Sequence, residues 1–252
     1  MREIFVRKNT LTMLDVDGQR RLRLSALLGY LQHAATEHAI STGFGGDRMI
    51  ADYRAMWLLV RTHLTQFRPI FVDDACVEVR TWCRRIDSAP IVLRDFDIVV
   101  NGNLVGEAIT SWVLVDVDTR KIIKPNTIPE LHSGTHPSQT KELRPQKVAM
   151  PTKMESVMYR PVYYSDTDIN GHMNNIKYAD IACDVLRYDE IHAQFISDVL
   201  INYLQESFPG DEITVLYAKE GERHYVRGAD SDGRGRFDLR LSLSQKTSEA
   251  TT

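Results

Sequence analysis

The chain has 252 residues, of which 43% are hydrophobic and 26% charged, and its formal net charge is −3. These values suit a folded globular protein, and they lack the basic excess of most nucleic-acid-binding domains. No apolar run approaches the ~20 residues that a membrane-spanning helix requires. We therefore expect neither nucleic acid nor a membrane among the partners of this protein.

The first half predicts one strand, one helix and then a run of strands. Apolar residues at i, i+3, i+4 and i+7 spacing from Leu24 to Ala35 predict the helix, and glycines in residues 41–46 predict its end. Asn101-Gly102-Asn103 predicts a hairpin between the last two strands. The predicted elements are a strand in residues 5–14, a helix in 24–40, and strands in 55–67, 77–82, 91–100 and 104–117.

The second half repeats this order after a connector that is rich in proline and polar residues. Its predicted elements are a strand in residues 157–164, a helix in 175–188, and strands in 198–207, 212–219, 222–229 and 235–243. Two units of the same plan indicate an α+β fold. The expected organisation is a first unit in residues 1–130, a linker in 131–155 and a second unit in 156–252.

Polar side chains concentrate just before the second predicted helix. Asp168, Asn170 and His172 alternate along the chain, so in an extended segment they would face the same side. Asn174 and Asn175 follow at the expected helix N-terminus, where free backbone N–H groups and the positive end of the helix dipole can stabilise a carbonyl oxygen. The pattern predicts a site that binds and polarises a carbonyl group.

This segment resembles the second-half signature of the acyl-acyl carrier protein thioesterases, in which Asp-x-Asn-x-His precedes Asn-Asn and a central helix. The matching residues run from Asp168 to Asn175. The resemblance implies two hotdog units in one chain, each an antiparallel sheet wrapped around a long helix. It also implies an enzyme that releases free fatty acid from acyl carrier protein and so terminates fatty acid synthesis, with the catalytic residues in the second unit. Plant members carry a plastid transit peptide, and the charged start of this chain instead suggests a bacterial cytoplasmic enzyme.

The first half has lost the polar set. When Asp17 is placed on Asp168 without gaps, Gln19 falls on Asn170 and Arg21 falls on His172. We infer that the second half carries the chemistry and that the first half shapes the acyl pocket.

The sequence lacks a Gly-x-Ser-x-Gly nucleophile elbow and a His-Glu-x-x-His zinc motif, which leaves water activated by a general base. The resemblance assigns the base to a Glu in the strand after the helix, and Glu206 occupies that place. Plant members have Cys after this Glu, whereas this chain has Ser207. The expected roles are Glu206 as base, His172 and Asn170 as positioning groups for water and thioester, and Asp168 as the residue that orients them.

Residue type suggests two further groups of candidate site residues, one for the acyl chain and one for the carrier. Apolar bulk in the first half suggests an acyl pocket, with Met56, Trp57 and Trp82 as candidates. The carrier that the resemblance implies is strongly acidic, so a basic cluster was expected to bind it. The candidates around one predicted hairpin are Arg80, Arg84, Arg85 and Arg94, and those in the connector are Lys141, Arg144 and Lys147.

Several alternatives stay open at this stage. The enzyme could hydrolyse acyl-coenzyme A thioesters, or it could be a hotdog enoyl-thioester hydratase or dehydratase, although those carry one more residue between Asn and His. A non-catalytic acyl-binding regulator would need an output domain. The three cysteines and the remaining histidines show no metal-ligand spacing, so we expect no metal and no cofactor. A monomer and a homodimer are equally compatible with the sequence.

Overall fold

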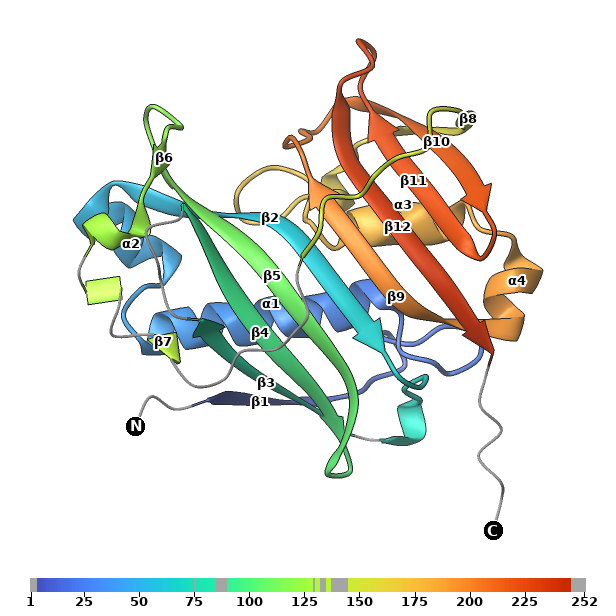
Figure 1. The fold of residues 1–252 in the computed structure, drawn as a ribbon, viewed down its shortest axis with the longest axis horizontal. Coiled ribbons are helices and arrows are strands. Elements are labelled where there is room, and N and C mark those ends of the chain that lie inside the picture. Colours follow the sequence, from blue (N-terminus) through green and yellow to red (C-terminus); the bar gives the residue numbers. More distant parts are fainter. Residues whose placement is uncertain are drawn as a thin grey trace.

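A computed structural model describes residues 4–74, 76–84, 90–128, 130–131, 135–136 and 145–245. One twisted sheet runs through both halves of the chain, and one helix from each half packs on the same face of it (Figure 1). The strand order along the main path is β1-β3-β4-β5-β2-β9-β12-β11-β10-β8, and neighbours in this path are antiparallel.

The first half contains β1 to β5 of this path, with two short strands beside them. Its helices and strands are β1 (Phe5–Thr10), α1 (Leu24–Ser41), α2 (Gly46–Tyr53), β2 (Ala55–Gln66), β3 (Cys76–Arg84), β4 (Ile91–Val100), β5 (Asn103–Asp116), β6 (Ile122–Ile123) and β7 (Thr135–His136). The predicted hairpin turn is present. Asn101 and Gly102 both have positive φ, at 51° and 79°, as the right-handed twist of a tight hairpin requires.

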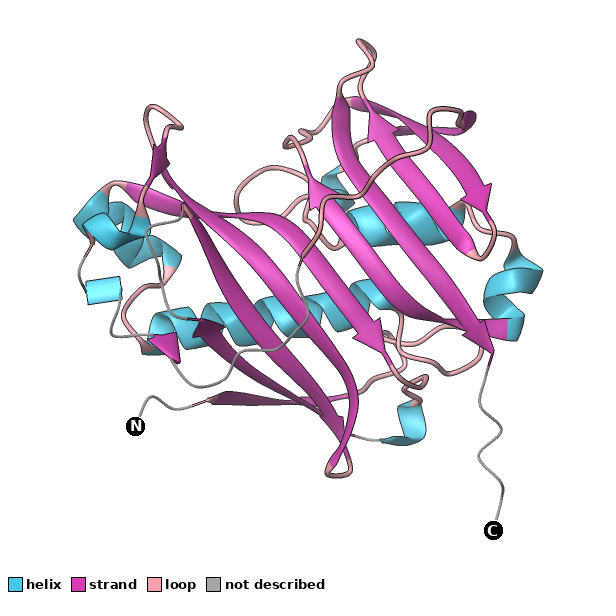
Figure 2. Ribbon diagram, viewed as in Figure 1, coloured by secondary structure: helices cyan, strands magenta, loops and turns pink. Residues whose placement is uncertain are grey.

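The second half has the same order of elements. They are β8 (Glu155–Pro161), α3 (Lys177–Asp184), α4 (Tyr188–Ala193), β9 (Gln194–Tyr203), β10 (Glu212–Glu220), β11 (Arg223–Ala229) and β12 (Gly235–Gln245). Within each half a five-stranded antiparallel sheet curves around a helix, which confirms the expected tandem hotdog architecture (Figure 2). The two halves join where β2 pairs with β9, so the strand order of one half mirrors that of the other.

The main hydrophobic core lies between the sheet and the helices. It includes Leu27 and Leu31 of α1, Ile181 of α3 and Phe237 of β12, all at most 2% exposed. One continuous cluster contains residues from both halves, because α1 and α3 meet on the same face of the sheet. The fold therefore places the second-half helix directly beside the helix of the first half.

The helix predicted at residues 175–188 is shorter than expected. It begins at Lys177 and ends at Asp184, and a separate helix, α4, follows. The last predicted residues of that helix instead begin the turn into α4. The connector also differs from a free linker, because Val148 is buried against Leu200 and Tyr225 on the face opposite the helices.

Candidate active site

The loop segment that carries Asp168, Asn170 and His172 is a tight turn and not extended, as the interpretation of the alternation had assumed. The Asp168 carboxylate accepts the backbone N–H of Asn170 at 2.9 Å, and the Asp168 N–H donates to the His172 carbonyl at 3.0 Å. Gly171 has a φ of 77°, a conformation that glycine adopts without strain. Aspartate favours such turns because its carboxylate replaces a backbone acceptor. All three predicted side chains nevertheless line one cavity.

The fourth predicted residue, Glu206, reaches the same place from a different element. It lies in the loop after β9, three residues beyond the end of the strand. Its Oε1 is 3.9 Å from His172 Nε2, and the other ring nitrogen, Nδ1, lies 4.0 Å from Asp168 Oδ1. The structure thus brings together the residues of the predicted catalytic set, Asp168, Asn170, His172 and Glu206.

The imidazole of His172 has a defined orientation. Nδ1 is 3.1 Å from the Met173 carbonyl oxygen, which can only accept a hydrogen bond, so Nδ1 carries the proton and donates. In the neutral ring, Nε2 is then an acceptor that faces the Glu206 carboxylate, another acceptor. Phe208 packs its ring edge-to-face against the imidazole at 6.3 Å between centroids.

The two loops of the site are tied to each other through the backbone. The Met173 N–H donates to the Ser207 carbonyl at 2.7 Å, so the positions of His172 and Glu206 depend on each other. Ser207 is fully buried, and its hydroxyl accepts a hydrogen bond from Tyr178 at 3.1 Å. Burial raises the pKa of Tyr178, which keeps this donor protonated. Ser207 does not line the cavity, so its hydroxyl is a structural group.

Arg120 is a site residue that the sequence analysis missed. It lies in the turn between β5 and β6, and its guanidinium contacts both carboxylate oxygens of Glu206 at 3.4 and 3.5 Å. It also contacts the sulfur of Met56 at 3.2 Å. Nothing in the local sequence marks this arginine, because it belongs to the first half and meets Glu206 only through the pairing of β2 with β9.

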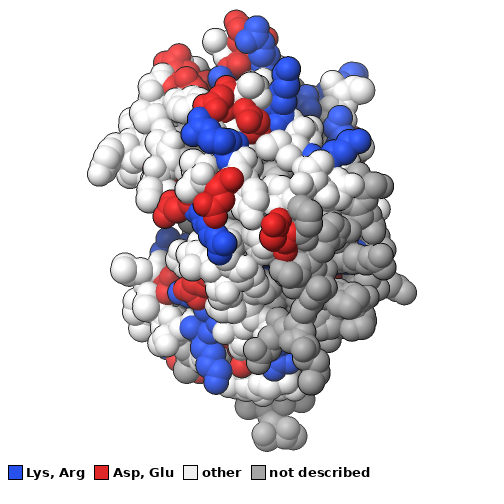
Figure 3. All heavy atoms as spheres, turned by 90° about the vertical axis from the view of Figure 1, so that its left-hand side faces the viewer, with Lys and Arg blue, Asp and Glu red and all other residues white. Residues whose placement is uncertain are grey.

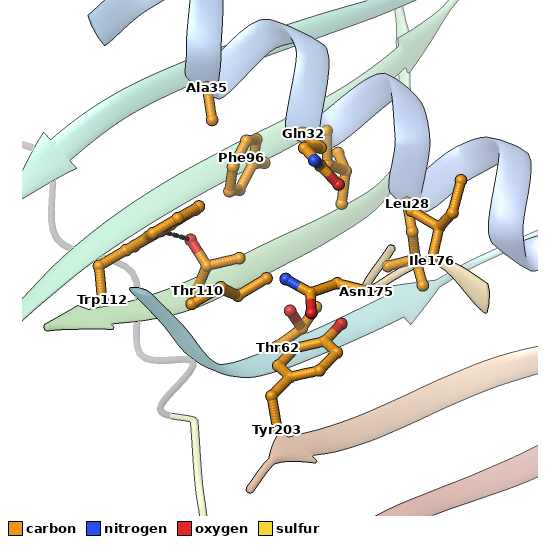
Figure 4. Close-up of a pocket in the computed structure, with 12 residues that line it drawn as sticks. Leu28, Gln32, Ala35, Thr62, Phe96, Thr110, Trp112, Asn175, Ile176 and Tyr203 are labelled. Carbon is orange, nitrogen blue, oxygen red and sulfur yellow. Dashed lines mark hydrogen bonds between the residues drawn. The ribbon is translucent and has the colours of Figure 1, made fainter. Parts of the chain in front are cut away.

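The two asparagines before α3 have different surroundings. Asn174 accepts the Ile176 N–H on its side-chain oxygen at 3.1 Å, and its own N–H donates to the Asp166 carbonyl at 2.8 Å. These bonds stabilise the loop and leave that backbone N–H occupied. Asn175 instead lies between α1 and the sheet, where its carboxamide faces Thr62 and Tyr203 (Figure 4).

A cavity of about 910 Å³ extends from the catalytic set into the first half. Met56 and Trp57 of β2 line it, as expected for acyl-pocket residues, and Trp112 of β5 adds to the same wall. Beside this cavity a smaller pocket lies between α1 and the sheet, with Trp112 and Phe96 beneath Ala35 and Gln32 of α1 (Figure 4). Trp82, the third predicted residue, is only 3% exposed and is not among the lining residues within the described part of the chain.

The predicted basic cluster does not form a surface patch. Arg84 and Arg94 are each 6% exposed, and Arg84 is held by Asp95 through two bonds at 2.7 and 2.8 Å. Arg80 is partly buried and bonded to Glu78 at 2.6 Å. The prediction failed for the two buried residues for different reasons. Arg94 has the parity of Phe96 on β4 and lies on the face that packs against α1, where it contacts His38. Arg84 lies on the other face, where it pairs with the buried Asp95. Arg85, Lys141 and Arg144 lie outside the described residues, and Lys147 is exposed.

The face at the α2 end carries basic and acidic side chains intermingled, and no single basic area dominates it (Figure 3). Within the described residues, no group of three or more His, Cys, Asp and Glu side chains is placed to hold a metal ion. No described helix is long and apolar enough to cross a membrane.

The first half contains a loop with the same backbone pattern as the catalytic turn. The Asp17 N–H donates to the Arg21 carbonyl at 2.8 Å, just as Asp168 bonds to His172. The Asp17 carboxylate accepts the N–H of the residue two positions on at 2.9 Å, which repeats the Asp168 turn. The gapless superposition of the two halves therefore holds at the level of backbone hydrogen bonds.

The side chains of the first-half loop have a structural function. Arg21, at the position of His172, bonds the Asp17 carboxylate at 2.7 and 2.9 Å. It also donates to the carbonyls of Ile191 and Gln194 in the second half. Arginine at this place thus neutralises the aspartate and holds the start of β9, where the second half has an imidazole.

The first half also has a different residue at the position that corresponds to Glu206. The turn at Phe71 repeats the turn at Phe208, because in each the phenylalanine N–H donates to an aspartate three residues on, at 2.8 and 2.9 Å. Two residues before these phenylalanines stand Pro69 and Glu206. Proline has no ionisable group, so the first half keeps the backbone of this turn without a carboxylate at the position of Glu206.

Comparison with known proteins finds a family match in each half. The model of the acyl-ACP thioesterase N-terminal domain matches residues 2–130, and that of the acyl-ACP thioesterase C-terminal domain matches residues 150–249. The chain belongs to the acyl-ACP thioesterase family. Members similar to it include oleoyl-acyl carrier protein thioesterase 1 of Arabidopsis thaliana, 22% identical over 87% of this chain and 65% of that protein. Another is the dodecanoyl-[acyl-carrier-protein] hydrolase of Cinnamomum camphora, 27% identical over 81% of this chain and 56% of that protein.

The chain thus spans less than two thirds of these chloroplastic relatives. Solved structures of the acyl-ACP thioesterase family share its fold over nearly the whole chain. The acyl-ACP thioesterase of Bacteroides thetaiotaomicron has a TM-score of 0.86 at 22% identity and covers 96% of this chain and 98% of its own. The 12:0-ACP thioesterase of Umbellularia californica has a TM-score of 0.84 at 20% identity, with the same coverage.

Proposed function

We propose that this protein hydrolyses acyl-ACP thioesters to free fatty acid and carrier thiol, and so ends acyl-chain synthesis. The observation that carries the proposal is the meeting of His172 and Glu206, from two separate loops, at a large cavity with aromatic walls. Family membership and the relatives' printed activities support the same reaction. The connected cavity offers space for an acyl chain beside the reacting carbonyl.

The spacing of the two catalytic acceptors suits a water molecule as nucleophile. His172 Nε2 and Glu206 Oε1 are 3.9 Å apart, too far for a direct hydrogen bond. A water between them can donate one hydrogen to each, which turns a lone pair toward the thioester carbon. Glu206 then takes the proton as the water oxygen attacks. When the tetrahedral intermediate collapses, the C–S bond breaks and the thiolate takes up the proton that Glu206 removed from the water. His172 Nε2, 3.9 Å from Glu206 Oε1, is the proposed relay for this proton.

Other residues of the site have supporting functions in this scheme. Asp168, 4.0 Å from His172 Nδ1, stabilises the imidazole when it is protonated. Asn170 lines the cavity at the turn and is a candidate to hold the water or the thioester. Asn175 is the better candidate for the oxyanion, since its carboxamide faces the cavity while the Asn174 N–H is occupied.

The test is thiol release from palmitoyl-ACP and palmitoyl-coenzyme A by the parent protein and by Glu206→Gln. We expect release with the parent and a rate loss on the order of 10²–10⁴ in the variant, because the amide cannot accept the proton. Glu222→Gln, at an exposed turn, is the matched control and should retain full activity. The ratio of the two carrier rates separates an acyl-ACP enzyme from an acyl-coenzyme A enzyme.

Full activity in Glu206→Gln would be consistent with hydrolysis but would contradict Glu206 as the general base. His172, whose Nε2 can accept a proton, would then be the candidate base. Release from neither carrier, over a series of acyl lengths, would contradict hydrolysis. Loss of enoyl-thioester absorbance under those conditions would then identify a hydratase.

A further inference from the structure

The acyl cavity contains a buried arginine far from the catalytic set. Arg94 of β4 is 6% exposed, and it lines the same cavity as His172 and Glu206. Its Nη1 donates to His38 Nδ1 at 2.8 Å and to Thr81 Oγ1 at 3.3 Å. Within the described residues these are the hydrogen bonds of its side chain, so Nε and Nη2 keep N–H groups to offer.

The partners of Arg94 carry no negative charge. An arginine only donates, so His38 Nδ1 is an acceptor and the ring is neutral. Burial and the neighbouring Arg94 lower the pKa of His38 to about 4, in agreement with that state. The adjacent carboxylate, Asp95, is bound by Arg84, and no ion pair joins Arg94 to a carboxylate within the described residues. A buried charge of this kind is costly unless a ligand or a partner compensates it.

The surroundings of Arg94 are otherwise suited to a hydrocarbon chain. Val92 precedes it on the same face of β4, and Leu131 and Trp112 also line this part of the cavity. Phe96, two residues further along β4, lies beneath α1 and lines the neighbouring small pocket (Figure 4). A polar group at the end of an apolar channel is the arrangement by which binding sites select a single substituent.

The sheet topology sets the distance between the two ends of the cavity. Glu206 follows β9, and Arg94 lies on β4. Strands β2 and β5 lie between β9 and β4 in the sheet. Three strand spacings correspond to roughly 14 Å. An acyl chain whose thioester lies at His172 and Glu206 would therefore bring its distal part, and not its carbonyl, to Arg94.

We propose that this cavity takes acyl chains that carry an oxygen substituent, a hydroxyl or a carboxylate, near the end remote from the thioester, and that Arg94 binds this group. The inference rests on the proposed thioesterase function and names its substrate class. The forked N–H groups of a guanidinium match a carboxylate with two bonds and a hydroxyl with one. His38 holds the fork in place through Nη1.

The experiment compares acyl thioesters of equal length whose far end is a methyl, a hydroxyl or a carboxylate group. For the parent protein we expect kcat/KM for at least one oxygenated chain to exceed that of the methyl-ended chain by about 10-fold or more. Arg94→Met should lose this preference and hydrolyse the methyl-ended chain at least as well as the parent, while Arg94→Lys should retain part of the preference. Arg61→Met, on β2 and outside the cavity lining, is the matched control.

A second readout does not depend on turnover or on the methionine variant folding. Calorimetric binding of the corresponding free acids to the parent protein and Arg94→Lys should rank the oxygenated acids above the methyl-ended acid. Equal or better binding and hydrolysis of the methyl-ended chain by the parent would overturn the proposal and leave Arg94 as a structural residue at the end of α1. If no thioester is hydrolysed, the proposed function fails, and the binding order alone decides the assignment of Arg94.

Discussion

Arg120 shows how much one contact between the halves can matter at the scale of single residues. Its side chain is about half exposed and reaches the carboxylate of Glu206 from the first half. We expect Arg120→Met to lower kcat about fivefold at unchanged KM, because an exposed pair contributes at most about 1 kcal/mol to holding the base. The measurement is steady-state thiol release from the acyl thioester.

Salt separates this effect from a structural one. High ionic strength screens an exposed ion pair, so the parent should approach the variant as salt is raised. Arg234→Met, which removes a more exposed pair with Asp232 in another turn, is the control and should show no loss. A deficit in Arg120→Met that persists unchanged at high salt would contradict the electrostatic interpretation.

His38 makes a prediction about stability and pH. Its folded-state pKa of about 4 lies below the value of 6.5 for an exposed histidine, first because of burial and then because of Arg94. Between these values the unfolded chain binds more protons, so stability rises with pH through this window and is lost as the pH falls. We expect the free energy of unfolding of the parent to be about 2 kcal/mol higher above this pH window than below it, and we expect His38→Gln to lack this difference. The figure is smaller than the full value that the pKa shift implies, because the cavity admits solvent.

The measurement is urea unfolding of the parent and the variant at pH 4.5 and pH 7. His33→Gln is the control, since His33 is exposed on the same helix and should leave the pH dependence unchanged. The assignment fails if the parent and His38→Gln lose the same amount of stability on acidification.

At the scale of elements, the catalytic loop depends on the strand before it. Arg160 of β8 donates to both oxygens of the buried Asp166 carboxylate at 2.7 and 3.0 Å, and the Tyr163 N–H donates to it at 2.9 Å. Although burial raises the pKa of Asp166, these bonds outweigh it and hold the pKa below its ordinary value. Asp166 in turn accepts the Asn174 N–H on its backbone carbonyl, so the loop is fixed at both ends.

Breaking this pair should be costly. Arg160→Met leaves a buried carboxylate without its cation, and we expect the free energy of unfolding to fall by about 3 kcal/mol, with reduced thiol release as His172 loses its support. Urea titration measures the first effect. Arg187→Met removes the exposed pair with Asp189 and should leave the free energy of unfolding nearly unchanged. A similar loss of unfolding free energy in both variants would contradict the expectation that burial makes the Arg160–Asp166 pair the more costly one to break.

The accuracy of the sequence predictions also varied by element. Strands with strict alternation, such as β4 and β12, were placed within two residues, because one buried face imposes a period of two. The strand predicted at 198–207 begins at Gln194 and ends at Tyr203, so Glu206 lies in a loop. Two short helices, α2 and α4, were missed, since each follows a turn and has too few residues for helical periodicity to be visible.

At the scale of the whole molecule, the pairing of β2 with β9 makes one sheet and one core out of two units. The buried cluster under the helices runs through both halves, and residues 145–154 cross the opposite face of the sheet (Figure 1). A chain built this way should unfold as one cooperative unit, since neither half can expose its seam without opening the shared core.

The tryptophans offer a direct test, because Trp57, Trp82 and Trp112 all lie in the first half. Leu239→Ala removes a fully buried side chain from the second half and should cost 2–5 kcal/mol. We expect the urea midpoint followed by tryptophan fluorescence and the midpoint followed by circular dichroism to shift together to lower urea concentration. Leu64→Ala, on the first-half side of the seam, should give coincident transitions as well. An unchanged fluorescence midpoint in Leu239→Ala would show that the halves unfold independently.

The sequence by itself determined the repeated plan and the fold class, and it indicated the residues that we propose as the catalytic set. Alternation and helical spacing follow from which face each element buries, and Asp168, Asn170 and His172 share one short turn. The tertiary structure decided everything that depends on which distant segments meet. It brought Glu206 to within 3.9 Å of His172 and placed Arg120 against Glu206. It also put Arg94 inside the cavity, where a basic surface had been expected. Side-chain direction on a strand fixes the face, but only sheet pairing and helix packing decide what lies opposite that face.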